Sequence, residues 1–205
     1  MSVPRDPAAR VLDRPSFTTA RLWLRPLTED DAEWLWELDQ DPEVVRQTSN
    51  GLPPTKEEMR GVLLPRFLRR FAEGAQYGFW TAGLVGTVSP VGWFHLKPGR
   101  LDPFEMEIGY RLFREQRGRG LATEGSRELI RKGFLEWGLP SIAAHALIGN
   151  LASRRVMEKC GLRLVREWVV PADWLPGRSA EERRAVYYRL DREPWLASMP
   201  SGGLS

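Results

Sequence analysis

Hydrophobic and polar residues alternate with a period of two over several short segments of this 205-residue chain. That period indicates strands with one buried face. It is clearest in FEMEIGYRLF, residues 104–113, where Glu107 and Arg111 fall on one face and Ile108 and Tyr110 on the other. By this pattern, and by short apolar runs, we expect strands at residues 20–28, 77–84, 90–99, 104–113, 141–149, 162–170 and 184–190.

Four other segments carry the longer period and the end signals of helices. The first, residues 28–41, opens with Thr28 and acidic residues in its first turn. The second begins at Thr55, and Pro65 should kink it. The remaining two are expected at residues 123–137 and 150–160, each followed by a glycine.

The order of these elements is β-α-α-β-β-β-α-β-α-β-β, without repeats or an internal linker. Such an order predicts a single mixed α/β domain. We place this domain at residues 17–195, between a flexible N-terminal arm (1–16) and a flexible tail (196–205).

Composition narrows the class of protein. The chain is 42% hydrophobic and 28% charged, with a formal net charge of +3, as in ordinary globular domains. It has no apolar signal segment and no run long enough to span a membrane, and its single cysteine, Cys160, cannot form an internal disulfide. We therefore expect a cytoplasmic protein. His95 and His145 are the only histidines, so no metal site is expected.

The stretch REQRGRGLATEGSREL, residues 114–129, places glycines and arginines between a strand and a helix. A helix N-terminus exposes unpaired N–H groups, and Gly118 and Gly120 let an anion approach the backbone. Arg117 and Arg119 add charged donors. These residues favour a pyrophosphate site, although neither a Walker P-loop nor a Rossmann fingerprint is present. A plain strand–helix turn or an RNA-binding arginine segment remains open.

The wider context resembles the GNAT N-acetyltransferase superfamily. Arg117-x-x-Gly120-x-Ala122 matches the superfamily's acyl-coenzyme A signature, Q/R-x-x-G-x-G/A. EIGYRL precedes it, ATEG overlaps its end, and N-x-x-S-x-x-V-M-E-K-C-G-L follows at residues 150–162. The resemblance covers roughly residues 18–190 and is nearest to the branch of the ribosomal-protein-alanine acetyltransferases.

This resemblance implies a mixed, mostly antiparallel sheet flanked by helices, whose fourth and fifth strands splay apart around acetyl-CoA. In such a fold the cosubstrate's pantetheine pairs with the fourth strand, and its pyrophosphate lies on the glycine–arginine turn. The implied coenzyme contacts are Tyr110, Arg111, Leu112, Arg117, Gly118, Arg119, Gly120, Leu121, Ala122, Thr123, Asn150 and Ser153. Asn150 is also a good N-cap for the helix that follows.

The implied reaction is direct attack of an amine on the acetyl thioester, which calls for a base. Glu107 is the first candidate, with Glu105 on the same face as the second; either could instead pair with arginines across the sheet. Many relatives carry a tyrosine as general acid where this chain has Met157. Ser153 is the replacement that the resemblance suggests. His95, His145 and Cys160 are interpreted as structural.

The acceptor is less well determined. Trp34 and Trp174 are expected to frame it, since aromatic walls suit a cationic amine. A small-molecule primary amine and a protein N-terminal α-amine are equally compatible. A homodimer is expected as well; membranes and nucleic acid are not expected partners. The alternatives are a non-catalytic acyl-CoA-binding module of the same fold and an arginine-rich RNA-binding protein.

Overall fold

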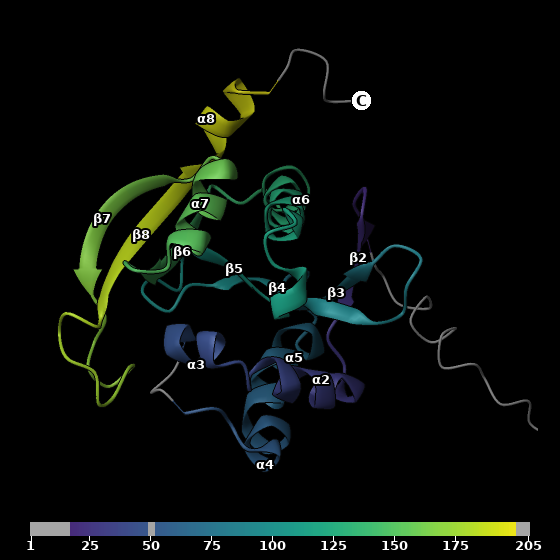
Figure 1. Ribbon diagram of the computed structural model, residues 1–205. Coiled ribbons are helices and arrows are strands. Elements are labelled where there is room, and N and C mark those ends of the chain that lie inside the picture. Colours follow the sequence, from purple (N-terminus) through teal and green to yellow (C-terminus); the bar gives the residue numbers. More distant parts are fainter. Residues whose placement is uncertain (1–16, 49–51, 200–205) are drawn as a thin grey trace, which may run out of the picture.

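The computed structural model describes residues 17–48 and 52–199, which form one eight-stranded sheet with helices on both faces (Figure 1). The sheet order is β1-β2-β3-β4-β5-β6-β8-β7, and every neighbouring pair is antiparallel except β5 and β6. The strands are β1 (Phe17–Thr18), β2 (Leu22–Pro26), β3 (Phe79–Leu84), β4 (Pro90–Pro98), β5 (Met106–Leu112), β6 (Ser141–Leu147), β7 (Arg163–Val169) and β8 (Arg184–Asp191). The predicted mixed, mostly antiparallel fold is confirmed.

Helices lie on both sides of the sheet, as Figure 1 shows. One layer contains α2 (Ala32–Leu38), α3 (Pro42–Thr48), α4 (Lys56–Glu58) and α5 (Leu64–Ala72). The other contains α6 (Leu121–Leu135), α7 (Leu151–Lys159) and α8 (Arg192–Ala197). Each layer covers its own hydrophobic core, because alternate residues of the central strands point to opposite faces.

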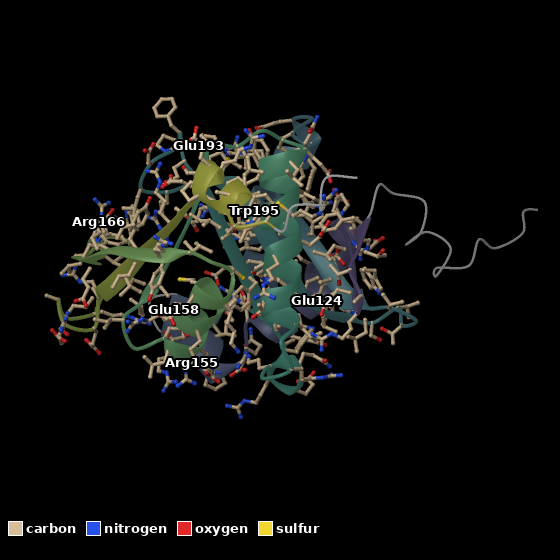
Figure 2. All side chains as sticks on the ribbon, turned by 90° about the horizontal axis from the view of Figure 1, so that it is seen from above. Glu124, Arg155, Glu158, Arg166, Glu193 and Trp195 are labelled. Carbon is tan, nitrogen blue, oxygen red and sulfur yellow. The ribbon has the colours of Figure 1, made fainter. Side chains whose placement is uncertain are left out.

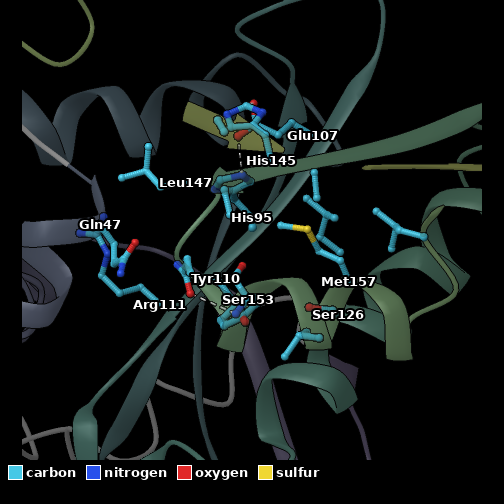
Figure 3. A pocket seen from close by; sticks show the side chains of 18 of the residues that line it. Gln47, His95, Glu107, Tyr110, Arg111, Ser126, His145, Leu147, Ser153 and Met157 are labelled. Atoms are coloured by element: carbon cyan, nitrogen blue, oxygen red, sulfur yellow. Dashed lines mark hydrogen bonds and ion pairs between the residues drawn. The ribbon is translucent and has the colours of Figure 1, made fainter. Parts of the chain in front are cut away.

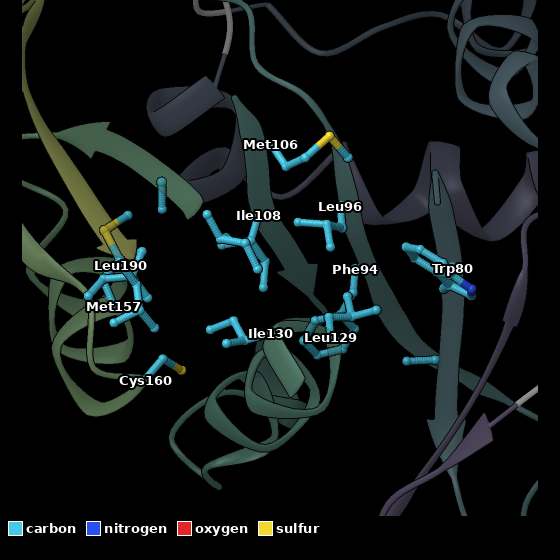
Figure 4. Close-up of a cluster of buried hydrophobic side chains, with 14 of the residues drawn as sticks. Trp80, Phe94, Leu96, Met106, Ile108, Leu129, Ile130, Met157, Cys160 and Leu190 are labelled. Atoms are coloured by element: carbon cyan, nitrogen blue, oxygen red, sulfur yellow. The ribbon is translucent and has the colours of Figure 1, made fainter. Parts of the chain in front are cut away.

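The larger core lies between the sheet and α6 (Figure 4). Phe94, Ile108, Leu129 and Ile130 meet there, and Phe94 and Leu129 are fully buried. The Phe94 ring lies so close to Gly125 of α6 that a Cβ on that glycine would be 2.4 Å from a ring carbon. The glycine therefore sets how closely α6 packs on β4.

The predicted splaying of the fourth and fifth strands is confirmed at β5 and β6. These strands pair only at Met106↔Ile142 and Glu107↔Ala143. Beyond Glu107, β5 continues to pair with β4 as far as Leu112, whereas β6 pairs with β8. An opening therefore begins in the middle of the sheet, directly after Glu107.

Three described elements were not predicted: strand β1, helix α3 and helix α8. Helix α8 spans residue 195, where we place the end of the domain, and the domain bounds stay a prediction. In α8, Trp195 packs against Phe134 of α6, with ring centroids 5.1 Å apart, and Figure 2 shows it beside that helix. At Pro65 the helix widens into a π-helical turn, Met59–Leu63, just before the proline. The wider turn accommodates the missing N–H. The predicted arm (1–16) and residues 200–205 of the tail lie outside the described residues.

Candidate active site

Two connected cavities of about 320 Å³ each occupy the opening between β5 and β6. We call them the histidine cavity, which is lined by His95, Glu107 and His145, and the glycine-turn cavity, which is lined by residues 116–118 and 120–123. The residues that line both are Gln47, Tyr110, Arg111, Asn150, Ser153 and Val156. A ligand that fills both cavities must therefore pass these six residues (Figure 3).

The glycine-turn cavity ends at the N-terminus of α6. Gly118 and Gly120 have φ values of 74° and 80°, a left-handed conformation that favours glycine, and Gly120 caps the helix. Among the described residues, no N–H from Gly118 to Thr123 donates to a backbone carbonyl; the N–H of Glu124 is the first to do so. Several donors thus converge on the cavity together with the positive end of the helix dipole, as an anion site requires.

Arg117 lines the glycine-turn cavity, and the side chains of Arg117 and Arg119 both have partners within the protein. Arg117 donates to the Leu112 carbonyl (3.0 Å) and pairs with Asp41 (2.8 Å) and Glu43 (2.9 Å) near the start of α3. Arg119 donates to Gln116 instead. A guanidinium that already holds two carboxylates has few donors left for a phosphate. Their charge therefore braces the turn, and the backbone supplies the anion site.

At the start of α7, Asn150 acts as the N-cap that its position predicts. Its side chain accepts a hydrogen bond from the Ser153 N–H (3.1 Å). The Ser153 side chain faces the Tyr110 side chain between the two cavities (Figure 3). Burial raises the pKa of Tyr110 to about 12, against a smaller opposing effect of Ser153. Both hydroxyls therefore carry protons at neutral pH.

Glu107 is the carboxylate of the histidine cavity. Its oxygens lie 3.4 Å from His95 Nε2, 3.4 Å from Lys97 Nζ and 3.8 Å from His145 Nε2. Burial alone would raise the pKa of Glu107, but these neighbours together hold it well below its usual range. The side chain is therefore ionised at neutral pH and faces a cavity that opens at its own strand.

The two histidines differ in their surroundings. His95 is buried on β4, stacked on Trp93, and burial lowers its pKa to about 4 despite the contact with Glu107. Neither of its ring nitrogens makes a well-aligned hydrogen bond to a described residue. His145 on β6 is half-buried and lines the same cavity. Both had been interpreted as structural, yet the structure brings them to Glu107 from two different strands.

The other candidates fall outside this centre. Glu105 accepts hydrogen bonds from Ser141 (3.3 Å) and Tyr187 and is absent from both cavities, so the structure gives it a bracing role. Trp34 donates to Asp31 (2.7 Å) beside Phe113 and lines neither cavity, and its place beside the acceptor stays a prediction.

Two sulfur-containing residues do line the histidine cavity. Cys160 does so with a thiol whose pKa burial raises to about 11, so it is no nucleophile. Met157 lies in the same wall, and its thioether supplies no proton.

Trp174 does line the histidine cavity, and with it come two residues that sequence reasoning missed. Trp168 packs edge-on against Trp174 (6.0 Å between centroids) and against His145 (6.1 Å). Arg100, from the β4–β5 loop, lies over the Trp174 ring at 3.7 Å. No local pattern could have paired Arg100 with Trp174, since the loops that carry these two residues are more than 60 positions apart.

A split sheet with an anion-binding helix end on one side and a buried carboxylate on the other defines an acyl-coenzyme A-dependent transferase. The family model for the acetyltransferase (GNAT) domain matches residues 21–163. The chain belongs to this family and is an acetyl-CoA-dependent N-acetyltransferase. No group of three or more metal-type ligands occurs in the described part of the chain, and none of its helices is long and apolar enough to cross a membrane.

Relatives of known name or structure agree with this assignment. The chain is 34% identical to the FsC-acetyl coenzyme A-N(2)-transacetylase of Aspergillus fumigatus, over 89% of this chain and 79% of that protein. A GNAT-family acetyltransferase from Bacillus anthracis superposes with a TM-score of 0.71 at 24% identity, over 87% and 99% of the two chains. The aminoglycoside acetyltransferase AAC(6')-Ib with coenzyme A gives 0.68 at 23% identity, over 86% and 98%. These two similarities support the fold.

Proposed function

We propose that this enzyme transfers an acetyl group from acetyl-CoA to a primary amine that binds in the histidine cavity, with Glu107 as the base. The observation that carries the proposal is the parting of β5 and β6 directly after Glu107. It joins the anion site of the glycine turn to the only carboxylate that lines the histidine cavity among the described residues.

In this proposal the glycine turn holds the pyrophosphate. The N–H groups of Gly118 to Thr123 are the donors, since none of them donates to a backbone carbonyl among the described residues. The open edge of β5, from Tyr110 to Leu112, pairs with the pantetheine amides as an added strand would. Asn150 and Ser153 line the path between the cavities. The thioester then lies beside Tyr110 and Ser153.

The chemistry follows from this placement. The amine nitrogen attacks the acetyl carbonyl carbon, the C–N bond forms, and the C–S bond breaks with its electron pair on sulfur. Glu107 accepts the surplus amine proton, and because its pKa is held low it releases that proton to water afterwards. The hydroxyls of Ser153 and Tyr110 donate hydrogen bonds to the departing sulfur, in place of the tyrosine that Met157 replaces.

The acceptor we favour is a small-molecule primary amine. The support is the relative at 34% identity, whose name describes transfer to an N(2) position. A protein N-terminal α-amine presents the same reactive group and stays the second candidate. Cytoplasmic location and a homodimer stay predictions.

Thermal unfolding with and without acetyl-CoA tests the coenzyme site. A ligand at about 100 times its Kd adds roughly 2.7 kcal/mol, which should raise the Tm by several degrees. Gly120→Asp should abolish this rise because it puts a carboxylate into the anion site. Gly138→Asp is the matched control, since Gly138 also has a positive φ (65°) and open space but lies at the far end of α6. If millimolar acetyl-CoA does not raise the Tm of the wild-type protein, the proposal is refuted. The alternative of an RNA-binding protein would then be tested next.

A further inference from the structure

The side chains around the histidine cavity carry more positive than negative charge, which does not favour binding of a polycation. Among its described lining residues, Glu107 is the only acid, whereas Arg100 and Arg111 are permanent cations. Lys97 and His145 already contact Glu107. Arg111 forms an ion pair with Asp39. Within residues 17–48 and 52–199, the Arg100 guanidinium stacks on Trp174 and forms no ion pair with a carboxylate. The cavity therefore offers one carboxylate to an amine, and beside it the positive charge of Arg100, unpaired among the described residues.

We propose that the acceptor is an amine that also carries a carboxylate or similar oxyanion, and that Arg100 binds this group. The proposal rests on the proposed function and names the substrate class of the same site. It assigns to Arg100 and Trp174 the role of distinguishing such amino acids and their derivatives from simple amines and polyamines.

The geometry of Arg100 suits this role. Its guanidinium lies over the Trp174 ring at 3.7 Å, which fixes the plane of the group. A stacked guanidinium keeps its N–H donors at the rim, where a carboxylate can accept two parallel hydrogen bonds. Trp174 in turn packs against Trp168, so the Trp174 ring is held in place. The guanidinium stacked on that ring is therefore already oriented before a ligand binds.

The separation between Glu107 and the Arg100 guanidinium also suits an acceptor with an amine at one end and a carboxylate at the other. The backbone N–H of Arg100 donates to Glu107 Oε2 at 3.4 Å. The backbone nitrogen of Arg100 is therefore 3.4 Å from the proposed base, and the guanidinium lies at most one arginine side chain beyond that nitrogen. An amine placed at Glu107 puts a carboxylate one or two carbons away within reach of this guanidinium.

The test is a steady-state assay of coenzyme A release with matched pairs of acceptors. L-phenylalanine is compared with phenethylamine, L-leucine with 3-methylbutylamine, and spermidine and kanamycin serve as polycations. The wild-type enzyme should favour the carboxylate-bearing member of each pair in kcat/KM. Arg100→Ala should lower kcat/KM for that member about 10- to 100-fold, as expected for a lost charged hydrogen bond, with little change for the plain amine.

Matched variants separate a binding role from a loss of fold. Arg163→Ala, an exposed arginine of β7 that lines neither cavity, should change nothing. Trp174→Ala should reproduce part of the Arg100→Ala loss, because the guanidinium loses its support. The proposal is overturned if spermidine or the plain amines are the better substrates, or if Arg100→Ala affects both members of a pair equally. Failure of every amine, with the acetyl-CoA thermal shift intact, would instead count against the proposed function.

Discussion

Lowering the pH from 7 to 4.5 should destabilise the fold through His95. In the unfolded chain this histidine takes up a proton near pH 6.5, whereas burial lowers its pKa in the fold to about 4. Between these values the unfolded state binds more protons, so stability falls as the pH falls. A pKa that moves from 6.5 to about 4 corresponds to roughly 3 kcal/mol, at about 1.36 kcal/mol per pH unit.

Most of that loss should occur above pH 4.5. Carboxylates whose pKa is lowered in the fold, such as Asp31 and Glu107, destabilise it only below their ordinary values of 3.8 and 4.5. Glu105 acts in the opposite direction, because burial raises its pKa. For a domain of this size, a loss of 2–3 kcal/mol corresponds to a Tm lower by roughly 5–10 °C.

Urea unfolding at pH 7.0, 5.5 and 4.5 measures the effect directly. His95→Phe keeps an aromatic ring between Trp93 and Phe79 and should flatten the profile, with His95→Gln as a second variant in case the larger ring does not fit. His145→Gln, at a half-buried position, should retain the profile. A wild-type stability that changes by less than about 0.5 kcal/mol, or an equal fall in both His95 variants, would refute this reasoning.

Three further predictions concern single side chains. Glu107→Gln should lower kcat about 10²- to 10⁴-fold, the range of a lost general base, and leave the acetyl-CoA thermal shift intact; equal turnover in Glu107→Gln and the Glu105→Gln control would exclude Glu107 as the base. Tyr110→Phe should lower kcat with little change in KM for acetyl-CoA, and full activity in steady-state assays would remove the hydroxyl from the mechanism. Gly125→Ala should lower the free energy of unfolding by about 1–3 kcal/mol, because its methyl group overlaps the Phe94 ring; unchanged chemical denaturation would show that α6 can shift freely.

Local patterns were enough for seven of the eight strands of the described residues, all but the short β1, and for the glycine turn before α6. The alternation in β5 assigned Glu107 and Tyr110 to opposite faces, and Gly120 indicated the start of α6 to within two residues. Helix α3 escaped prediction because PEVVRQT is too short to show a helical period. The ion pairs of Arg117 with Asp41 and Glu43 could not be predicted, because these partners lie more than 70 positions away. Its contact with the coenzyme stays a prediction.

The same limit explains what was missed in the histidine cavity. His95, Glu107 and His145 belong to three strands, and only the pairing of β5 with both β4 and β6 brings them together. The pKa shifts of His95 and Glu107 arise from that meeting and from burial, neither of which is encoded in a local window. Arg100 and Trp174 belong to loops, and loops have no sequence periodicity from which a contact could be predicted.

The parting of β5 and β6 has a consequence for amide hydrogen exchange. Beyond Glu107, alternate N–H groups of β5 are bonded to β4, while those between them point into the opening. Neighbouring residues of one strand should therefore exchange at different rates, with a protected amide next to an unprotected one. A ligand that pairs with the open edge of β5 would protect the second set of amides as well and so remove this alternation. The exchange rates of neighbouring β5 amides therefore report whether the opening is filled.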